Sequence, residues 1–187
     1  SSNQYGIVRK SFLSNNNDSA VSVKLLDGIQ NIMPFGVNSD LQAIRSNLVD
    51  AYKKSELEAD AGLGIYALSA IIVDRAEPSE ALKANIVWSA GLNQPVHLLS
   101  STQLDAFRRG DSVTEEIDVK AKKGAYFVST EVSLDAGKEE TWMILANVNQ
   151  TAASIAEISG KISSGNDLFS EVNEDIANGS NRLQRLV

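Results

Sequence analysis

The sequence predicts a mainly β protein with helices, in which an antiparallel β-sandwich spans residues 1–149 and a helical segment spans 150–187. Over the first two thirds of the chain, short runs alternate apolar with polar residues and are separated by Gly, Pro, Asn and Asp, which is typical of strands joined by turns. From Gln150 the apolar residues recur every three or four positions, which indicates helices. This order predicts two packed sheets with a helical extension.

The first two strands are expected at residues 5–14 and 19–33, on either side of the turn-forming loop Asn-Asn-Asn-Asp. The second run keeps its apolar side chains on one face as far as Leu25, after which the alternation slips. Gly28 lies where a β-bulge would redirect the strand, so a bulge is expected there. Pro34 ends the run because proline cannot donate to the ladder.

A helical insertion is expected near residues 38–53. Its apolar residues follow one another at spacings of three and four: Leu41, Ile44, Leu48 and Tyr52. Asn38 or Ser39 is a suitable N-cap, because either side chain can accept a hydrogen bond from an amide of the first turn. The pattern therefore predicts an amphipathic helix after the second strand.

Four further strand-like runs follow, at residues 62–75, 81–92, 124–134 and 139–148. The first is apolar on both faces, as expected of a central strand that is covered on two sides. The last two are joined across Asp-Ala-Gly-Lys, where Gly137 suits a tight hairpin. Residues 99–110 predict a short helical turn or loop between the two pairs of strands.

The C-terminal segment predicts helices, and the last of them carries an apolar stripe. The stripe consists of Leu168, Val172, Ile176, Leu183 and Leu186. Such a stripe has to be covered, because an amphipathic helix is stabilised by burying its apolar face. It is expected to pack on the sheet or on a further domain of a longer protein.

The composition excludes several classes of function. The chain has 187 residues, 43% of them hydrophobic and 22% charged, which is enough apolar material for a core without a metal or a disulfide. A formal net charge of −7 argues against nucleic acid or an anionic membrane as a partner. The chain has no cysteine, which excludes thiol catalysis and cysteine-bound metals. No cofactor is expected.

The N-terminal residues show no signal-peptide pattern and lead almost directly into strand-like sequence, which predicts a fragment of a longer chain. No run approaches the roughly 20 apolar residues that a membrane span needs. Neither feature distinguishes a cytoplasmic from a periplasmic location.

Few residues are candidates for catalysis. The single histidine, His97, could be a general base or a metal ligand, but neither role has partners in view, so a loop histidine near the surface is expected. The candidate carboxylates for a catalytic pair are Asp27, Asp50, Glu56, Asp74 and Glu77. Asp27 is expected to bond to local amides. Nothing pairs any two of the carboxylates, and no catalytic, cofactor-binding or metal-binding residue is predicted.

Trp88 and Trp142 could stack on sugar rings, as aromatic side chains do in carbohydrate sites. However, Trp88 falls on the apolar face of its expected strand, and Trp142 begins a nearly continuous apolar run. We therefore expect both tryptophans in the core.

Four stretches of the sequence carry a resemblance to a known family. They are "LLDGIQNIMPFGV" (25–37), "SNLVDAYKKSEL" (46–57), "IVDRAEPSEALKANIVWSAGL" (72–92) and "LDAGKEETWMILANVNQTAASIAEI" (134–158). Together they resemble the N-terminal β-sandwich of bacterial cellobiose-phosphorylase-like proteins, which are glycoside phosphorylases and hydrolases. In that family a super-sandwich related to galactose-mutarotase folds precedes linker helices and an (α/α)6 barrel.

The resemblance implies that the chain is a non-catalytic domain. The catalytic residues of the family belong to the barrel, so none can be carried over to this chain. The implied partners are the barrel of the same polypeptide, a second copy in a homodimer, and an oligosaccharide substrate bound through the parent enzyme. The segment with Arg45, Asn47 and Tyr52 is expected to face the barrel or the rim of the sugar site, or to cover an open sheet edge.

Two other functions are compatible with the sequence. A stand-alone carbohydrate-binding β-sandwich would show affinity for sugars and a row of exposed aromatic side chains. A small enzyme, such as a mutarotase-like sugar epimerase, would need His97 and a carboxylate.

Overall fold

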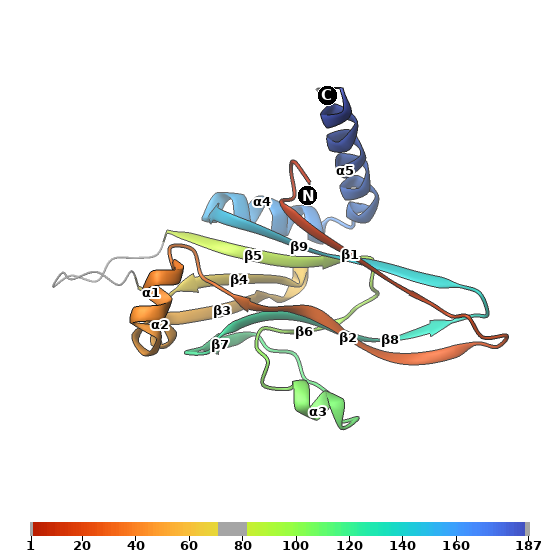
Figure 1. Cartoon of the computed structure of the whole chain (residues 1–187), viewed down its shortest axis with the longest axis horizontal. Helices are drawn as coiled ribbons and strands as arrows, with labels where there is room; N and C mark the ends of the chain where they lie inside the picture. The colour runs from red at the N-terminus through yellow and green to blue at the C-terminus, as the bar shows by residue number, and fades with distance from the viewer. Residues whose placement is uncertain (1, 71–81, 186–187) are drawn as a thin grey trace.

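The structure is a computed structural model that describes residues 2–70 and 82–185 (Figure 1). The described strands form two antiparallel sheets. In strand order, the six-stranded sheet consists of β1 (Ile7–Ser14), β9 (Glu139–Thr151), β5 (Lys83–Ala90), β4 (Leu63–Leu68), β3 (Lys53–Glu58) and β7 (Asp118–Lys120). The three-stranded sheet consists of β2 (Val21–Ile32), β8 (Gly124–Leu134) and β6 (Val96–Leu98). The prediction of a mainly β protein with antiparallel sheets is confirmed.

The two sheets pack face to face through a buried cluster. It includes Leu57, Tyr66, Val87 and Ile144 of the large sheet and Tyr126 and Val128 of the small one. Both tyrosine hydroxyls are satisfied inside it, because Tyr66 Oη donates to Ala125 O and Tyr126 Oη donates to Gly62 O, each at 2.6 Å. Burial raises the pKa of both tyrosines, so both remain neutral donors.

The opposite face of the large sheet is covered by two helices, α4 (Ala152–Ser163) and α5 (Leu168–Gln184). The residues buried in this second cluster include Trp88, Met143, Leu145, Leu168 and Val172. The helices, the large sheet and the small sheet therefore lie in successive layers (Figure 1). The predicted C-terminal helices are confirmed.

The apolar stripe of α5 is covered over its first turns. Leu168 and Val172 are buried and Ile176 is half-buried, whereas Leu183 is 67% exposed. Leu186 lies outside the described residues. The helix therefore starts against the sheet and extends beyond it (Figure 1). None of the described helices is both long and apolar enough to cross a membrane.

The β-bulge expected at Gly28 is not there, so this prediction was wrong. β2 continues in register past Gly28 and shifts only between Gln30 and Ile32. Asn31 at the shift has a φ of 58°, which asparagine tolerates better than most residues. Gly28 is required for another reason, since an added Cβ would lie 2.3 Å from the carbonyl oxygen of Tyr126. The small sheet therefore needs a residue without a side chain at this point.

The insertion near residues 38–53 consists of two short helices, α1 (Ser39–Ile44) and α2 (Ser46–Tyr52). Asn38 is the N-cap, and its Oδ1 accepts from the Leu41 amide at 2.7 Å. The helix breaks at Arg45, whose φ of −128° and ψ of 35° are not helical. We refer to this pair of helices as the α1–α2 corner, which lies at one end of the sheets (Figure 1).

Three strands do not follow from the sequence pattern, namely β3, β6 and β7. The last two are three residues long, too short to show a clear alternation. β3 reads Lys-Lys-Ser-Glu-Leu-Glu, yet Lys53 is only 3% exposed. The Lys53 ammonium donates to Asp50 at 2.7 Å and to Gln42 at 2.8 Å, and its bond to Asp50 lowers the pKa of that carboxyl. A paired lysine thus occupies a core position where the pattern expects an apolar residue.

The other expected elements are found among the described residues, but one expected pairing is not. β4 lies inside the large sheet between β3 and β5, as expected for the run at 62–75, whose residues from 71 onward are outside the described part. A 3₁₀ helix, η1 (Ala59–Ala61), links β3 to β4. The hairpin expected between residues 124–134 and 139–148 does not form, so this prediction was wrong. The turn at Gly137, whose φ is 68°, instead carries the chain from β8 of the small sheet to β9 of the large sheet. The predicted helical turn is α3 (Leu104–Arg108).

Candidate functional site

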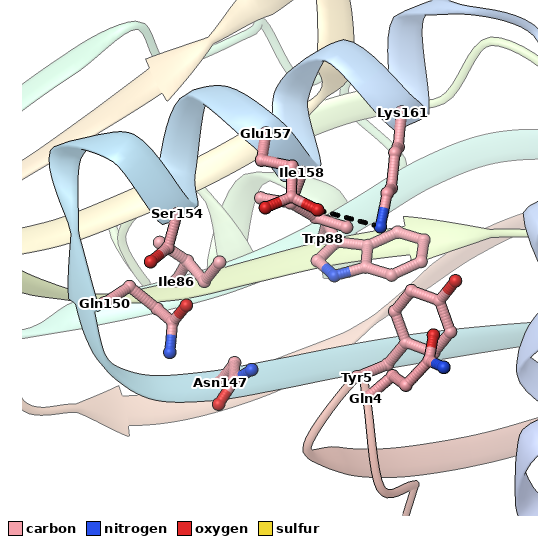
Figure 2. Close-up of a pocket in the computed structure, with 10 residues that line it drawn as sticks. All are labelled: Gln4, Tyr5, Ile86, Trp88, Asn147, Gln150, Ser154, Glu157, Ile158 and Lys161. Carbon is pink, nitrogen blue, oxygen red and sulfur yellow. Dashed lines mark ion pairs between the residues drawn. The ribbon is translucent and has the colours of Figure 1, made fainter.

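A pocket of about 250 Å³ lies on the helical side of the large sheet (Figure 2). It is formed by α4, β5, β9 and the residues before β1, and we refer to it as the α4 pocket. Its apolar lining consists of Tyr5, Ile86, Trp88 and Ile158. Its polar lining consists of Gln4, Asn147, Gln150, Ser154, Glu157 and Lys161.

The floor of the α4 pocket comes from β5. Ile86 and Trp88 are two residues apart, so both side chains point to the helical face of the sheet. Trp88 is 1% exposed, and Tyr5 packs edge-on against it with ring centroids 5.9 Å apart. Tyr5 Oη donates to Glu171 of α5 at 3.1 Å, and burial together with this carboxylate raises the pKa of Tyr5. The two rings form a packed apolar wall.

One face of α4 forms the outer wall of the α4 pocket. Glu157, Ile158 and Lys161 follow Ser154 by three, four and seven positions, so all four residues share that face. The helix begins after Thr151, whose Oγ1 accepts from the Ser154 amide at 3.3 Å. Glu157 and Lys161 form an ion pair at 3.1 Å, with side chains 70% and 44% exposed. The pair lies at the rim, where the two charges compensate each other.

A register shift brings two amides of β9 to the same side of the pocket. Asn147 and Gln150 are three residues apart and would point to opposite faces in a regular strand. However, the pairing of β9 with β5 shifts between Ala84 and Ile86, and Asn149 has a φ of 59°. The irregularity turns Gln150 to the side of Asn147, and both line the cavity (Figure 2).

The backbone uses one end of each of these amides. Asn147 Oδ1 accepts from the Val148 amide at 3.0 Å, and Gln150 Nε2 donates to the Val148 carbonyl at 2.7 Å. Within the described part of the chain, Asn147 Nδ2 and Gln150 Oε1 have no hydrogen-bond partner. The pocket thus offers neutral donors and acceptors beside an apolar wall, which is typical of a binding site for a small polar molecule.

The structure places Arg45, Asn47 and Tyr52 on the α1–α2 corner, and none of them lines the α4 pocket. Arg45 and Asn47 are exposed, and Tyr52 is half-buried. Near them in the chain, Ile44 is 79% exposed and Leu48 is 41% exposed. Much of the apolar pattern that predicts a helix here is therefore left uncovered by the described residues.

The described candidate carboxylates do not form a catalytic pair with one another. Each forms an ion pair with a different cation, as Asp27–Arg9, Asp50–Lys53 and Glu56–Lys54. Asp27 also accepts from the Gly28 amide at 2.9 Å, as expected. Asp74 and Glu77 lie outside the described residues. Residues 2–70 and 82–185 contain no group of three or more acidic or histidine side chains that could hold a metal ion.

His97 is buried in β6, so the expectation of a loop histidine near the surface was wrong. It is 8% exposed, and its Nδ1 is 3.1 Å from Glu115 Oε1. Its ring packs on the backbone at Gly62, where an added Cβ would lie 2.6 Å from Nε2. Burial lowers the pKa of His97, although the contact with Glu115 opposes this change.

The stability of the protein is expected to fall as the pH is lowered below about 6.5, the ordinary pKa of histidine. In this range His97 binds a proton more readily in the unfolded chain than in the folded state. The free energy of unfolding therefore decreases as the pH is lowered. Urea denaturation near neutral pH and at about one unit below this pKa measures the change.

The control is His97→Gln, because the chain has no other histidine. The variant is expected to lose most of the difference between the two pH values. An equal difference in the variant and the wild type would contradict the assignment to His97. The lowered pKa values of Asp50 and Asp175 have the same sign but act at more acidic pH, below about 4.

Trp88 and Trp142 are 1% and 4% exposed, which confirms the predicted core positions. The fold is that of a mainly β protein with two antiparallel sheets and C-terminal helices, and the α4 pocket is a small cavity with a largely polar lining. No protein-family model matches the chain, and no curated protein matches it either. The function is therefore proposed from the resemblance of its four sequence stretches and from the residues that the structure leaves exposed.

Proposed function

We propose that the chain is a non-catalytic sandwich domain, of the super-sandwich type, that supports a catalytic (α/α)6 barrel in the same polypeptide. The complete protein acts on carbohydrates as a glycoside phosphorylase or hydrolase. The barrel holds the oligosaccharide substrate, and the sandwich is also available for contact in a homodimer. The exposed apolar residues of the α1–α2 corner are the observation that carries this proposal.

The α1–α2 corner has the features of a contact surface. Val49 is fully buried and fixes the corner to the sandwich, while Ile44 and Leu48 remain 79% and 41% exposed. Exposed apolar side chains rimmed by polar ones are typical of interaction sites. Arg45 and Asn47 supply the polar rim, and arginine is enriched at protein interfaces. The corner also includes most of the stretch 46–57, which resembles the family.

Helix α5 supports the same proposal. Its first turns are held by Leu168 and Val172, and its later part extends beyond the sheet with Leu183 67% exposed. A helix held at one end and uncovered at the other is suited to link the sandwich to a following domain.

Changing both Ile44 and Leu48 to Glu in the complete protein tests the proposal. Charges at an apolar contact are costly to bury, so the sandwich is expected to unfold in a separate transition from the barrel. In the 187-residue chain the same change should lower the free energy of unfolding by about 1 kcal/mol or less, because both side chains are exposed. Differential scanning calorimetry of both proteins measures the two effects.

Phe12→Glu is the matched control. Phe12 is 68% exposed but belongs to β1, which runs toward the end of the sheets that is away from the α1–α2 corner (Figure 1). It is expected to leave the calorimetric trace of the complete protein unchanged. The proposal is contradicted when the double variant of the complete protein unfolds as the wild type does.

A further inference from the structure

We propose that the α4 pocket binds one neutral polyhydroxyl ring of the size of a monosaccharide. This binding function goes beyond the supporting role proposed above and does not depend on an attached barrel. It is argued from the volume of the pocket, the hydrogen-bonding groups that line it and the balance of charge at its rim.

The volume of the pocket limits the ligand. Sites for drug-sized molecules have volumes of roughly 300–1,000 Å³, whereas the α4 pocket has about 250 Å³. It is therefore large enough for a single small ring and too small for an extended chain of rings.

The indole N–H of Trp88 is a hydrogen-bond donor that faces the pocket. The residue is 1% exposed, and its nitrogen points toward the side of the cavity formed by Asn147 and Gln150 (Figure 2). Among the described residues this N–H has no hydrogen-bond acceptor. The buried side-chain nitrogens without a partner in the described part of the chain belong to Arg9, so the Trp88 nitrogen is accessible from the pocket and can donate to an oxygen of a bound ligand.

The other free groups of the pocket alternate between donor and acceptor. Asn147 Nδ2 can donate, and Gln150 Oε1 can accept, because the backbone at Val148 already holds the opposite end of each amide. A hydroxyl group can accept one hydrogen bond and donate another at the same time. Neighbouring hydroxyls on one ring therefore match this lining better than a ligand with only donors or only acceptors.

The charge at the rim favours a neutral ligand. Glu157 and Lys161 are 3.1 Å apart and compensate each other, and the remaining polar lining of the pocket is uncharged. An anion would have to compete with Glu157 for Lys161, and a cation would have to compete with Lys161 for Glu157. A neutral ring can bind without separating the pair.

The apolar wall completes the match. Ile86, Ile158 and the packed rings of Tyr5 and Trp88 line the part of the pocket that offers few polar groups. A sugar ring has C–H groups on its faces and hydroxyls at its edge. It can therefore place its C–H groups against this wall while its hydroxyls reach the amides.

Titration of the 187-residue chain with D-glucose, D-galactose, D-mannose and N-acetyl-D-glucosamine tests the proposal. Amide chemical shifts report the site directly. At least one of these sugars is expected to bind with a dissociation constant of about 1 mM or tighter and to shift the resonances of Asn147, Gln150 and the Trp88 indole. The uronic acid of the sugar that binds is expected to bind at least tenfold more weakly.

Gln150→Leu is the principal variant, and Gln184→Leu is its matched control. Gln184 is exposed on α5 and does not line the pocket. Gln150→Leu should weaken binding at least tenfold, and the control should not. Trp88→Phe keeps an aromatic ring and removes only the N–H donor, so it should also weaken binding. The proposal is overturned when none of the four sugars binds, when the uronic acid binds as well as its neutral sugar, or when Gln150→Leu binds normally.

Discussion

Replacing Gly28 with alanine is expected to lower the free energy of unfolding by about 3 kcal/mol, because the new methyl group has no room. Its Cβ would lie 2.2 Å from Phe127 Cδ1 and 2.3 Å from the Tyr126 carbonyl oxygen. The ring of Phe127 can turn aside, but the carbonyl cannot move without disturbing the pairing of β2 with β8. Because this pairing holds most of the small sheet together, the whole domain should be affected.

Urea denaturation measures this change, and Gly160→Ala is the matched control. Gly160 lies inside α4 with no atom within 4 Å of an added Cβ. Alanine there should raise the free energy of unfolding by about 0.5–1 kcal/mol, since it favours the helix more than glycine does. A Gly28→Ala variant as stable as the wild type would mean that β2 and β8 do not approach as closely as described.

Replacing Asp27 with alanine is expected to cost about 3 kcal/mol of the free energy of unfolding, because several partners lose a charged acceptor together. Asp27 Oδ2 accepts from Trp142 Nε1 at 2.7 Å and from Ser11 Oγ at 3.3 Å. It also forms an ion pair with Arg9. These bonds join β2 of the small sheet to β1 and β9 of the large sheet, and the carboxylate is 20% exposed. The role of Asp27 in the described structure is therefore to tie the two sheets together.

Asp105→Ala is the matched control for this second prediction. Asp105 also pairs with an arginine, Arg108, but the two side chains are 79% and 71% exposed. Exposed ion pairs contribute little to stability, so the control should unfold almost as the wild type does. Denaturation followed by tryptophan fluorescence also reports on Trp142. Equal stability of the Asp27→Ala and Asp105→Ala variants would contradict the account.

The parts of the fold that could be predicted are those with a strong local signal. Strands β8 and β9 have long apolar runs on both sides of Gly137, and the N-cap Asn38 precedes a helical period. The runs do not encode which strands pair, and β8 and β9 lie in different sheets instead of forming the expected hairpin. β3 could not be predicted, because its buried Lys53 is paired by residues of the preceding helices. The small sheet could be predicted only in part, because β6 has three residues, which are too few to show an alternating pattern.

The α4 pocket could not be predicted from the sequence for a different reason. Its lining comes from segments far apart in the chain, including Gln4 before β1, Trp88 on β5 and Glu157 on α4. Only the antiparallel pairing of β1, β9 and β5 brings these segments together. The position of Gln150 depends on a register shift, and alternation alone would assign its side chain to the opposite face. Asn149, a residue type that tolerates a positive φ, was the local signal available.

The α1–α2 corner could be predicted from the sequence only in part. The helical period was correctly read, but the break at Arg45 is not encoded by a proline or glycine. The same pattern also assigns Ile44 to the buried face, whereas it is 79% exposed. Where a local pattern predicts burial and the sandwich provides none, a contact with another domain is the explanation that we propose.

The central claim is that this chain works as a supporting domain within a longer polypeptide. The mass of the intact protein from its native source, measured by blotting or mass spectrometry, tests that claim most directly. We predict a product several times larger than 20.1 kDa. A native product of about 20.1 kDa would contradict the account, and the exposed apolar residues of the α1–α2 corner would then need another partner.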